Sequence, residues 1–257
     1  MGWQWVSRMA SWVEGGAAIV AARPRAWALF ALSALALAAI PFPSWLMDAV
    51  APIGLLFGLR LAGRCEGEEY SAAQLRHALE VAVLWGMLLA VFGMLFSFGQ
   101  DTVMLAALLA GVDGHWQMPV SGGLLDWWFG LGERLSDLAL MPYFWFSPAF
   151  FGVALALHKG HGWIESEVET TLALIFRPEV RDPLIALWAT VLLSNLFLPE
   201  FSQVWLGLLV WVLGPPIVFV AYQDIFANKR KPPRKRQTVR KTSAFAQPVL
   251  RPVRAKG

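Results

Sequence analysis

The chain has 257 residues, of which 57% are hydrophobic and 15% are charged, and it holds 14 tryptophans at a formal net charge of +3. Soluble domains average about 25% charged residues, so this composition excludes an ordinary soluble domain. It also excludes intrinsic disorder and a disulfide scaffold for most of the length, which leaves an all-α, polytopic integral membrane protein.

The N-terminal segment, residues 1–25, is predicted to lie on the membrane surface ahead of the first span. Trp5, Met9 and Trp12 recur at helical spacing and place apolar side chains on one face of a helix. Such an amphipathic helix lies in the interface, and Pro24 is where we expect the chain to turn into the membrane. The alternative is a frayed terminus.

Residues 26–226 are predicted to form a bundle of about six transmembrane helices. A helix needs roughly 20 apolar residues to cross the hydrocarbon core of a bilayer. The stretches that qualify or nearly qualify are 26–40, 45–61, 81–98, 138–157, 184–198 and 204–222. Ahead of the third stretch, Ser71 and Gln74 have the spacing of a capping box.

A tryptophan-rich loop, at about residues 99–137, is predicted on the outer side. Tryptophan favours the headgroup level of a membrane, and the loop carries Trp116, Trp127 and Trp128. Its apolar run 103–112 is too short to span, so we interpret it as interfacial or re-entrant. The alternative is a seventh span, which would reverse the topology of everything downstream.

The distribution of positive charge predicts that both termini are cytoplasmic. Lysine and arginine are retained on the cytoplasmic side of spans. With six spans, only Arg134 of the 21 lysines and arginines falls on the opposite side, a pattern that a seventh span would spoil. We therefore predict a multi-pass protein of the bacterial cytoplasmic (inner) membrane.

The last segment, residues 227–257, is a basic tail with eleven lysines and arginines and neither aspartate nor glutamate. It contains four prolines and few apolar residues, so we expect it to be disordered when alone. The densest charge directly follows the sixth span. It consists of Lys229, Arg230, Lys231, Arg234, Lys235 and Arg236.

This position favours binding to anionic lipid headgroups, at about 1 kcal/mol per basic residue near the surface. Two alternatives stay open: the charges act only as a topology determinant, or they bind a protein or RNA partner. Nucleic acid is disfavoured because Phe245 is the only aromatic residue in the tail, and binding of single strands uses aromatic stacking.

The predicted spans carry few polar features. None has a charge at its centre, so a proton relay or a path for a charged substrate is not expected. Asp48 lies near the start of the second span, where we expect water at the outer interface to solvate it. Pro148 and the pair Pro215 and Pro216 are expected to kink the fourth and sixth spans, either for packing or as a midplane binding site.

A search for catalytic motifs finds no nucleotide-binding loop, nucleophile elbow or His-Glu-x-x-His, so neither a catalytic residue nor a cofactor is predicted. His158, His161 and Glu165 have ligand-type side chains and are weak candidates for a metal site. Gly160 breaks the helix that would align them. The following stretch, 163–176, has the pattern of an amphipathic cytoplasmic helix.

Four short motifs carry a resemblance to a known family: Arg-Pro-Arg-Ala-Trp at 23–27, Ala-Pro-Ile-Gly at 51–54, Trp-Phe-Ser-Pro-Ala at 145–149 and Ala-Tyr-Gln-Asp-Ile-Phe at 221–226. Over about residues 1–226 the chain resembles bacterial six-span inner-membrane proteins of unknown function, which often close on a Tyr-x-Asp-Ile/Val-Phe-like motif. The resemblance implies a helical bundle in the cytoplasmic membrane and transfers no catalytic residue. The long outer loop and the basic tail depart from it.

Three functions are compatible with this pattern. The favoured one is a non-enzymatic accessory or scaffold component whose tail contacts anionic lipid or a cytoplasmic partner. The second is a transporter or channel for a neutral or apolar solute through the kinked spans, which the lack of an internal repeat disfavours. The third is a lipid-acting membrane enzyme that uses His158, His161 and Glu165. The oligomeric state is not predicted.

Overall fold

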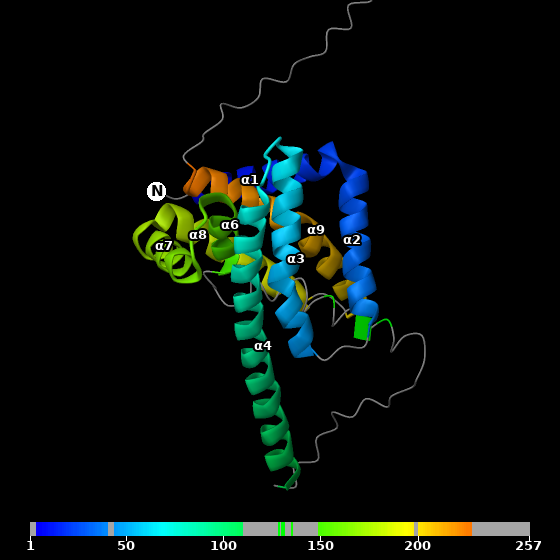
Figure 1. Ribbon diagram of the computed structural model, residues 1–257. Coiled ribbons are helices and arrows are strands. Elements are labelled where there is room, and N and C mark those ends of the chain that lie inside the picture. Colours follow the sequence, from blue (N-terminus) through cyan, green and yellow to red (C-terminus); the bar gives the residue numbers. More distant parts are fainter. Residues whose placement is uncertain are drawn as a thin grey trace, which may run out of the picture.

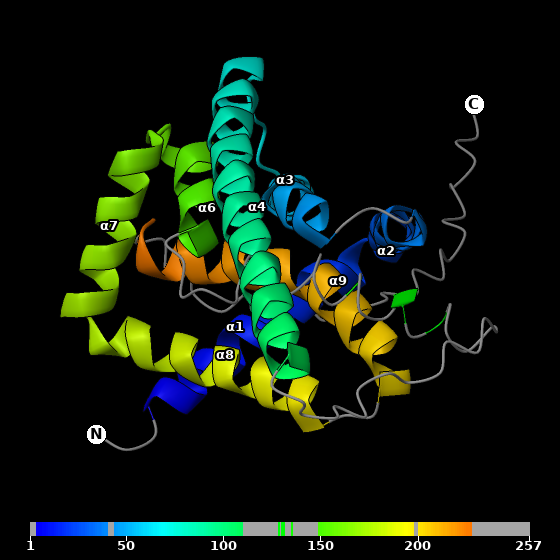
Figure 2. The ribbon, with the colours of Figure 1, turned by 90° about the horizontal axis from the view of Figure 1, so that it is seen from below.

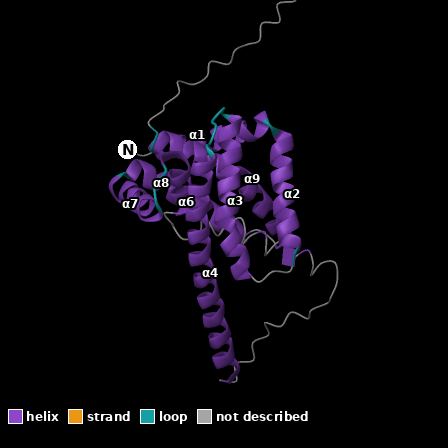
Figure 3. Ribbon diagram, viewed as in Figure 1, coloured by secondary structure: helices purple, strands orange, loops and turns teal. Residues whose placement is uncertain are grey.

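The computed structural model describes residues 4–40, 44–109, 128, 130–131, 135, 149–197 and 200–227. Over these ranges the chain forms eight helices and no strand, which agrees with the predicted all-α class (Figures 1 and 3). The helices are α1 (Gln4–Ala22), α2 (Pro24–Ala39), α3 (Ser44–Cys65), α4 (Ala72–Leu109), α6 (Ala149–Lys159), α7 (Trp163–Phe176), α8 (Pro178–Phe197) and α9 (Glu200–Ile225). The basic tail from Lys229 onward and most of the predicted outer loop lie outside the described residues.

Three helices among the described residues are long and apolar enough to cross a membrane, and a fourth span exists if α1 and α2 together count as one. The three segments are Leu46–Cys65, Ala72–Leu95 and Val204–Ile225. The chain is therefore a helical protein suited to a membrane, whereas the number six stays a prediction. The predicted fourth span, 138–157, is described only from Ala149 onward.

α1 and α2 meet at a sharp elbow, where the two helix axes are bent by 100°. Pro24 begins α2, and its fixed φ suits the first turn of a helix. The residue before a proline is pushed out of helical conformation, and Arg23 has φ −139°. The bend falls where the sequence predicts a turn at Pro24.

α4 runs without a break from Ala72 to Leu109, so residues 99–109 are helical where the sequence predicts the start of a loop. A helix of 38 residues is roughly 57 Å long, well beyond the hydrocarbon thickness of a bilayer. Most of the apolar run at 103–112 therefore continues the same helix and is not a separate segment. Gln100 and Asp101 are polar without being helix breakers, which explains why the helix passes through them.

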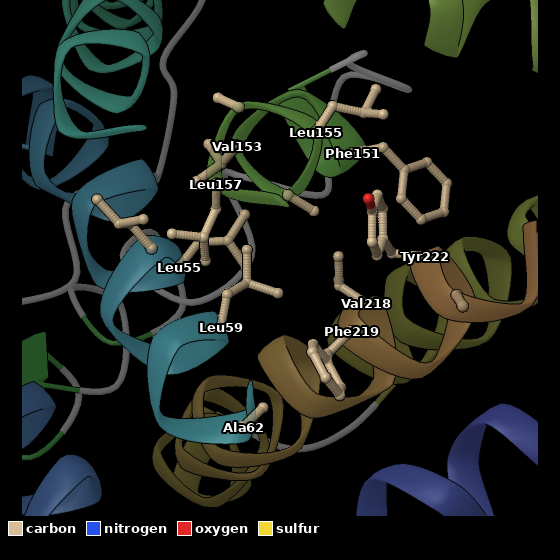
Figure 4. Close-up of a cluster of buried hydrophobic side chains, with 14 of the residues drawn as sticks. Leu55, Leu59, Ala62, Phe151, Val153, Leu155, Leu157, Val218, Phe219 and Tyr222 are labelled. Atoms are coloured by element: carbon tan, nitrogen blue, oxygen red, sulfur yellow. The ribbon is translucent and has the colours of Figure 1, made fainter. Parts of the chain in front are cut away.

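The larger core cluster joins α1, α2, α3, α4, α6, α8 and α9 near the elbow end of the bundle. Its centre is drawn in Figure 4, where Leu55 of α3 lies beside Leu157 of α6, and Phe151 of α6 lies beside Tyr222 of α9. Asp48 does not take the solvated position expected for it. Its side chain is 1% exposed, because it shares the inward face of α3 with Met47 and Ala51.

Pro215 and Pro216 lie inside α9, which continues as a helix on both sides of them. In Figures 1 and 2 the ribbon of α9 changes direction between its gold and orange parts. The bend packs against α3, because a Cβ built on Gly58 would overlap the ring of Pro215. Pro148, the other predicted kink, lies outside the described residues.

Candidate functional site

A layer of polar side chains joins the helix ends at the elbow end of the bundle, and we refer to it as the polar layer. It consists of Arg8 and Trp12 of α1, Glu68 and Tyr70 between α3 and α4, His158 of α6, and Tyr222, Gln223 and Asp224 of α9. The connection that holds Glu68 turns at Gly67, whose φ of +84° suits glycine. The predicted capping box then starts α4, since the Gln74 N–H donates to Ser71 Oγ at 3.2 Å and the Ser71 N–H to Gln74 Oε1 at 2.9 Å.

Glu68 is the hub of the polar layer. Its Oε2 accepts a hydrogen bond from the Tyr70 hydroxyl at 2.9 Å and lies 3.2 Å from His158 Nδ1. Its Oε1 accepts from the Gln223 amide at 3.2 Å. Burial acts to raise the pKa of Glu68, but the bonds from these three neighbours outweigh burial and hold the pKa below its ordinary value of 4.5. Glu68 is therefore a carboxylate at neutral pH.

His158 sits in an aromatic box above this carboxylate. The Tyr222 ring stacks on the imidazole with centroids 4.5 Å apart, and the Tyr70 and Phe219 rings lie at 5.4 and 5.5 Å. Burial and the nearby Glu68 raise the pKa of Tyr70, so its hydroxyl stays protonated and donates. His158 is 9% exposed, and its Nε2 is buried with no hydrogen-bond partner among the described residues. Its position between Glu68 and Tyr222 is that of a buried, oriented imidazole.

The other two predicted ligand-type residues point elsewhere. His161 Nδ1 lies 3.0 Å from Glu169 Oε2, and Glu169 Oε1 accepts from Lys159 Nζ at 2.5 Å. Glu165 caps α7, because its Oε2 accepts the Gly162 N–H at 3.1 Å. In the part of the chain that the structure describes, groups of three or more histidine, cysteine or acidic side chains suited to a metal ion are absent. Three separate contacts thus take the place of one predicted cluster.

α1 is tied to the end of α9 by a partly buried ion pair. Arg8 Nε donates to Asp224 Oδ2 at 2.6 Å, and the Trp12 indole N–H donates to the same oxygen at 3.1 Å. Arg8 Nη1 also donates to the backbone carbonyl of Glu179 in α8 at 3.0 Å. Because Arg8 reaches two helices and Trp12 is fully buried, α1 is part of the packed structure and not a frayed terminus.

Three consecutive residues of α9 therefore contact three different elements. Tyr222 stacks on α6, Gln223 binds the connection between α3 and α4, and Asp224 binds α1. These residues belong to the segment 221–226 at the end of α9. The helix that precedes the basic tail is thereby fixed on several sides.

The sequence does not predict these partners. Glu68, Tyr70 and Arg8 are not among its candidate site residues, and Asp224 appears there only within the motif 221–226. The available signal is a run of polar residues at the end of an apolar helix, 222–224, together with a short acidic connection at 66–69. Of the predicted binding residues, Lys229 to Arg236 lie outside the described residues.

Comparison of the chain with protein-family models, with curated proteins and with solved structures finds no match. Function must therefore be inferred from the arrangement of the polar layer itself. Chemically, this arrangement can hold helix ends together through charge-assisted hydrogen bonds, which are stronger than neutral ones.

Proposed function

We propose that the protein is an accessory or scaffold component of the cytoplasmic membrane whose basic tail contacts anionic lipid headgroups. The observation that supports this most is the fixed end of α9, where Tyr222, Gln223 and Asp224 are each bound to a different element. The tail begins directly after this point. On this proposal both termini are cytoplasmic, and the resemblance to six-span inner-membrane proteins describes the fold.

On this proposal the fixed helix end holds the start of the tail close to the membrane surface. A fully extended chain advances at most about 3.6 Å per residue, so Lys229 stays within about 7 Å of Ala227 and Arg236 within about 32 Å. Other basic side chains gather at this end of the bundle, since Arg23 and Arg25 at the start of α2 and Arg64 at the end of α3 are exposed. Glu66 and Glu69, between α3 and α4, are exposed at the same end, so the net positive charge that attracts anionic headgroups comes from the tail.

The competing functions have less support from the geometry. A solute path through the kink of α9 would need space there, yet Gly54 and Gly58 of α3 pack directly against Trp211 and Pro215. A lipid-acting enzyme would need His158, His161 and Glu165 near one another, and each of them has a different partner. The alternative to lipid is a cytoplasmic protein that binds the same basic residues of the tail.

The proposal predicts that neutralising the proximal charges of the tail removes bound anionic lipid. In the full chain we would replace Lys229, Arg230, Lys231, Arg234, Lys235 and Arg236 by glutamine. At about 1 kcal/mol per residue, each substitution weakens binding about fivefold, so most of the enrichment of anionic over zwitterionic lipid should be lost. The measurement is the lipid retained per protein after purification in mild detergent, by mass spectrometry.

The matched control replaces the five distal basic residues by glutamine, namely Arg240, Lys241, Arg251, Arg254 and Lys256. It removes nearly as much charge from positions farther along the tail, and it should keep most of the enrichment. Equal lipid retention by the proximal variant and the native chain would contradict lipid binding by the tail. A stoichiometric protein that co-purifies with the native chain and is lost from the proximal variant would instead identify the tail as a docking segment for that partner.

A further inference from the structure

α7 carries an exposed apolar stripe along its whole length. The stripe consists of Ile164, Val168, Leu172, Ile175 and Phe176, which are 49% to 73% exposed. These positions fall within one third of the helix circumference. The opposite face, with Ser166, Thr170 and Ala173, is buried against the rest of the protein. A stripe of this size on an otherwise packed helix needs an apolar environment.

The packing of α7 places it at the level of the membrane. The Trp163 ring at its start contacts Trp85 of α4, with centroids 6.0 Å apart. Trp85 lies inside the candidate span Ala72–Leu95, roughly 6 Å along the helix axis from Val81, where the uncharged part of that span begins. α6 joins this contact, since a Cβ built on Gly152 would lie 3.1 Å from Trp85 Nε1 and 3.8 Å from Ser166 Cβ. α7 thus lies beside the apolar part of α4 and not beyond its end.

α7 also runs crosswise to the upright helices. Figure 2 shows α7 along its length, while α2 and α3, upright in Figure 1, are seen nearly end-on. A helix in this orientation stays at one depth. A helix that lies in the plane of a membrane buries its apolar face about 5–10 Å into the boundary between headgroups and acyl chains.

The acidic residues of α7 are compatible with a lipid surface. Glu165 is used as a cap, and Glu169 pairs with Lys159 and lies 3.0 Å from His161 Nδ1. Burial raises the pKa of Glu167, which favours its neutral form. Two of the three acidic side chains of α7 are thus paired with groups of the protein itself.

We infer that α7 is an interfacial helix whose apolar stripe is covered by the acyl chains of the surrounding bilayer. This gives the protein a second lipid-binding element, which does not depend on the tail. α4 offers a direct comparison, because its exposed Leu84 and Met87 lie on a candidate span that passes through the same bilayer.

The test uses the full chain, with Cys65→Ser to remove the native thiol, in vesicles of mixed zwitterionic and anionic phospholipid. An environment-sensitive fluorophore is attached at Leu172→Cys. Leu84→Cys serves as the control for a lipid-facing site, and Glu69→Cys serves as the control for a water-facing site at the same end of the bundle. Quenching is measured with lipids that carry a spin label near the headgroup, and separately with iodide in the water.

The label at Leu172 is expected to lose most of its fluorescence to the spin-labelled lipid and little to iodide, as at Leu84 and unlike Glu69. Strong quenching by iodide would overturn the inference, because the stripe would then face water. Protection from both quenchers would also overturn it. In that case either the tail or a second copy of the chain would cover the stripe. Removal of residues 228–257 separates these two occupants, since quenching that returns identifies the tail and protection that continues identifies a second copy. Neither result depends on lipid binding by the tail.

Discussion

Gly86→Val is expected to destabilise the protein by about 3 kcal/mol or more, because inserting extra methylenes into a well-packed core typically costs about 1–3 kcal/mol and here the clash is with backbone. α3 and α4 cross at this position so closely that a Cβ on Gly86 would overlap the backbone carbonyl oxygen of Ala49. A backbone atom cannot rotate away, so the two helices must separate. The stability of Gly86→Ala should lie between those of the native chain and Gly86→Val. Alanine gains about 1 kcal/mol in helix propensity over glycine, but this gain is smaller than the loss from the overlap.

The measurement is thermal unfolding in detergent, followed as the loss of monodisperse protein on heating. Met87→Val is the matched control, because it places the same side chain on the same helix at an exposed position. Its effect should stay within about 0.5 kcal/mol. If Gly86→Val resists heat as well as Met87→Val does, the close crossing of α3 and α4 is wrong.

Glu68→Ala is expected to cost about 2–4 kcal/mol of stability. It removes the shared acceptor of Tyr70, Gln223 and His158, and polar groups left without partners in a buried site lose about 1–3 kcal/mol each, though not additively. Glu68→Gln keeps one carbonyl acceptor and should fall between the native chain and Glu68→Ala. Glu69→Ala changes the exposed neighbour and should have almost no effect.

The contribution of Glu68 should also depend on pH. Its pKa in the folded protein is lowered from 4.5, so its stabilising effect is complete above pH 4.5 and is lost as the pH falls through the lowered pKa. The difference in melting temperature between the native chain and Glu68→Ala should therefore be constant near neutral pH and shrink below pH 4.5. A difference that stays unchanged in acid would show that Glu68 is not held as a carboxylate.

Local features of the fold were predictable from nearby residues. Pro24 sets the elbow because a proline suits the first turn of one helix and pushes the residue before it out of helical conformation, which ends the preceding helix. The apolar periodicity of residues 163–176 predicted α7 with its bounds, and Ser71 with Gln74 predicted the start of α4. Each of these rests on contacts within a few positions along the chain.

The polar layer could not be predicted in this way, because its partners are far apart in sequence. Glu68 and Gln223 are separated by 155 positions, and Arg8 and Asp224 by 216. Their spacing in the sequence grouped His158 with His161 and Glu165. In the structure the chain turns at Gly160, with φ +70°, and the three side chains contact different neighbours. The direction of a side chain after a turn depends on tertiary packing, which one sequence does not specify.

The polar layer holds α1 and the end of α9 together, and on the proposed function it thereby fixes the start of the tail. Hydrogen–deuterium exchange of the full chain in nanodiscs tests this, with Asp224→Asn compared to the native protein and Glu179→Gln as control, since Arg8 uses only the backbone of Glu179. We predict that residues 5–16 are protected in the native chain and in Glu179→Gln, and exchange about tenfold faster or more in Asp224→Asn, while residues 81–95 do not change. Equal exchange of residues 5–16 in all three proteins would contradict a role of the polar layer in holding α1.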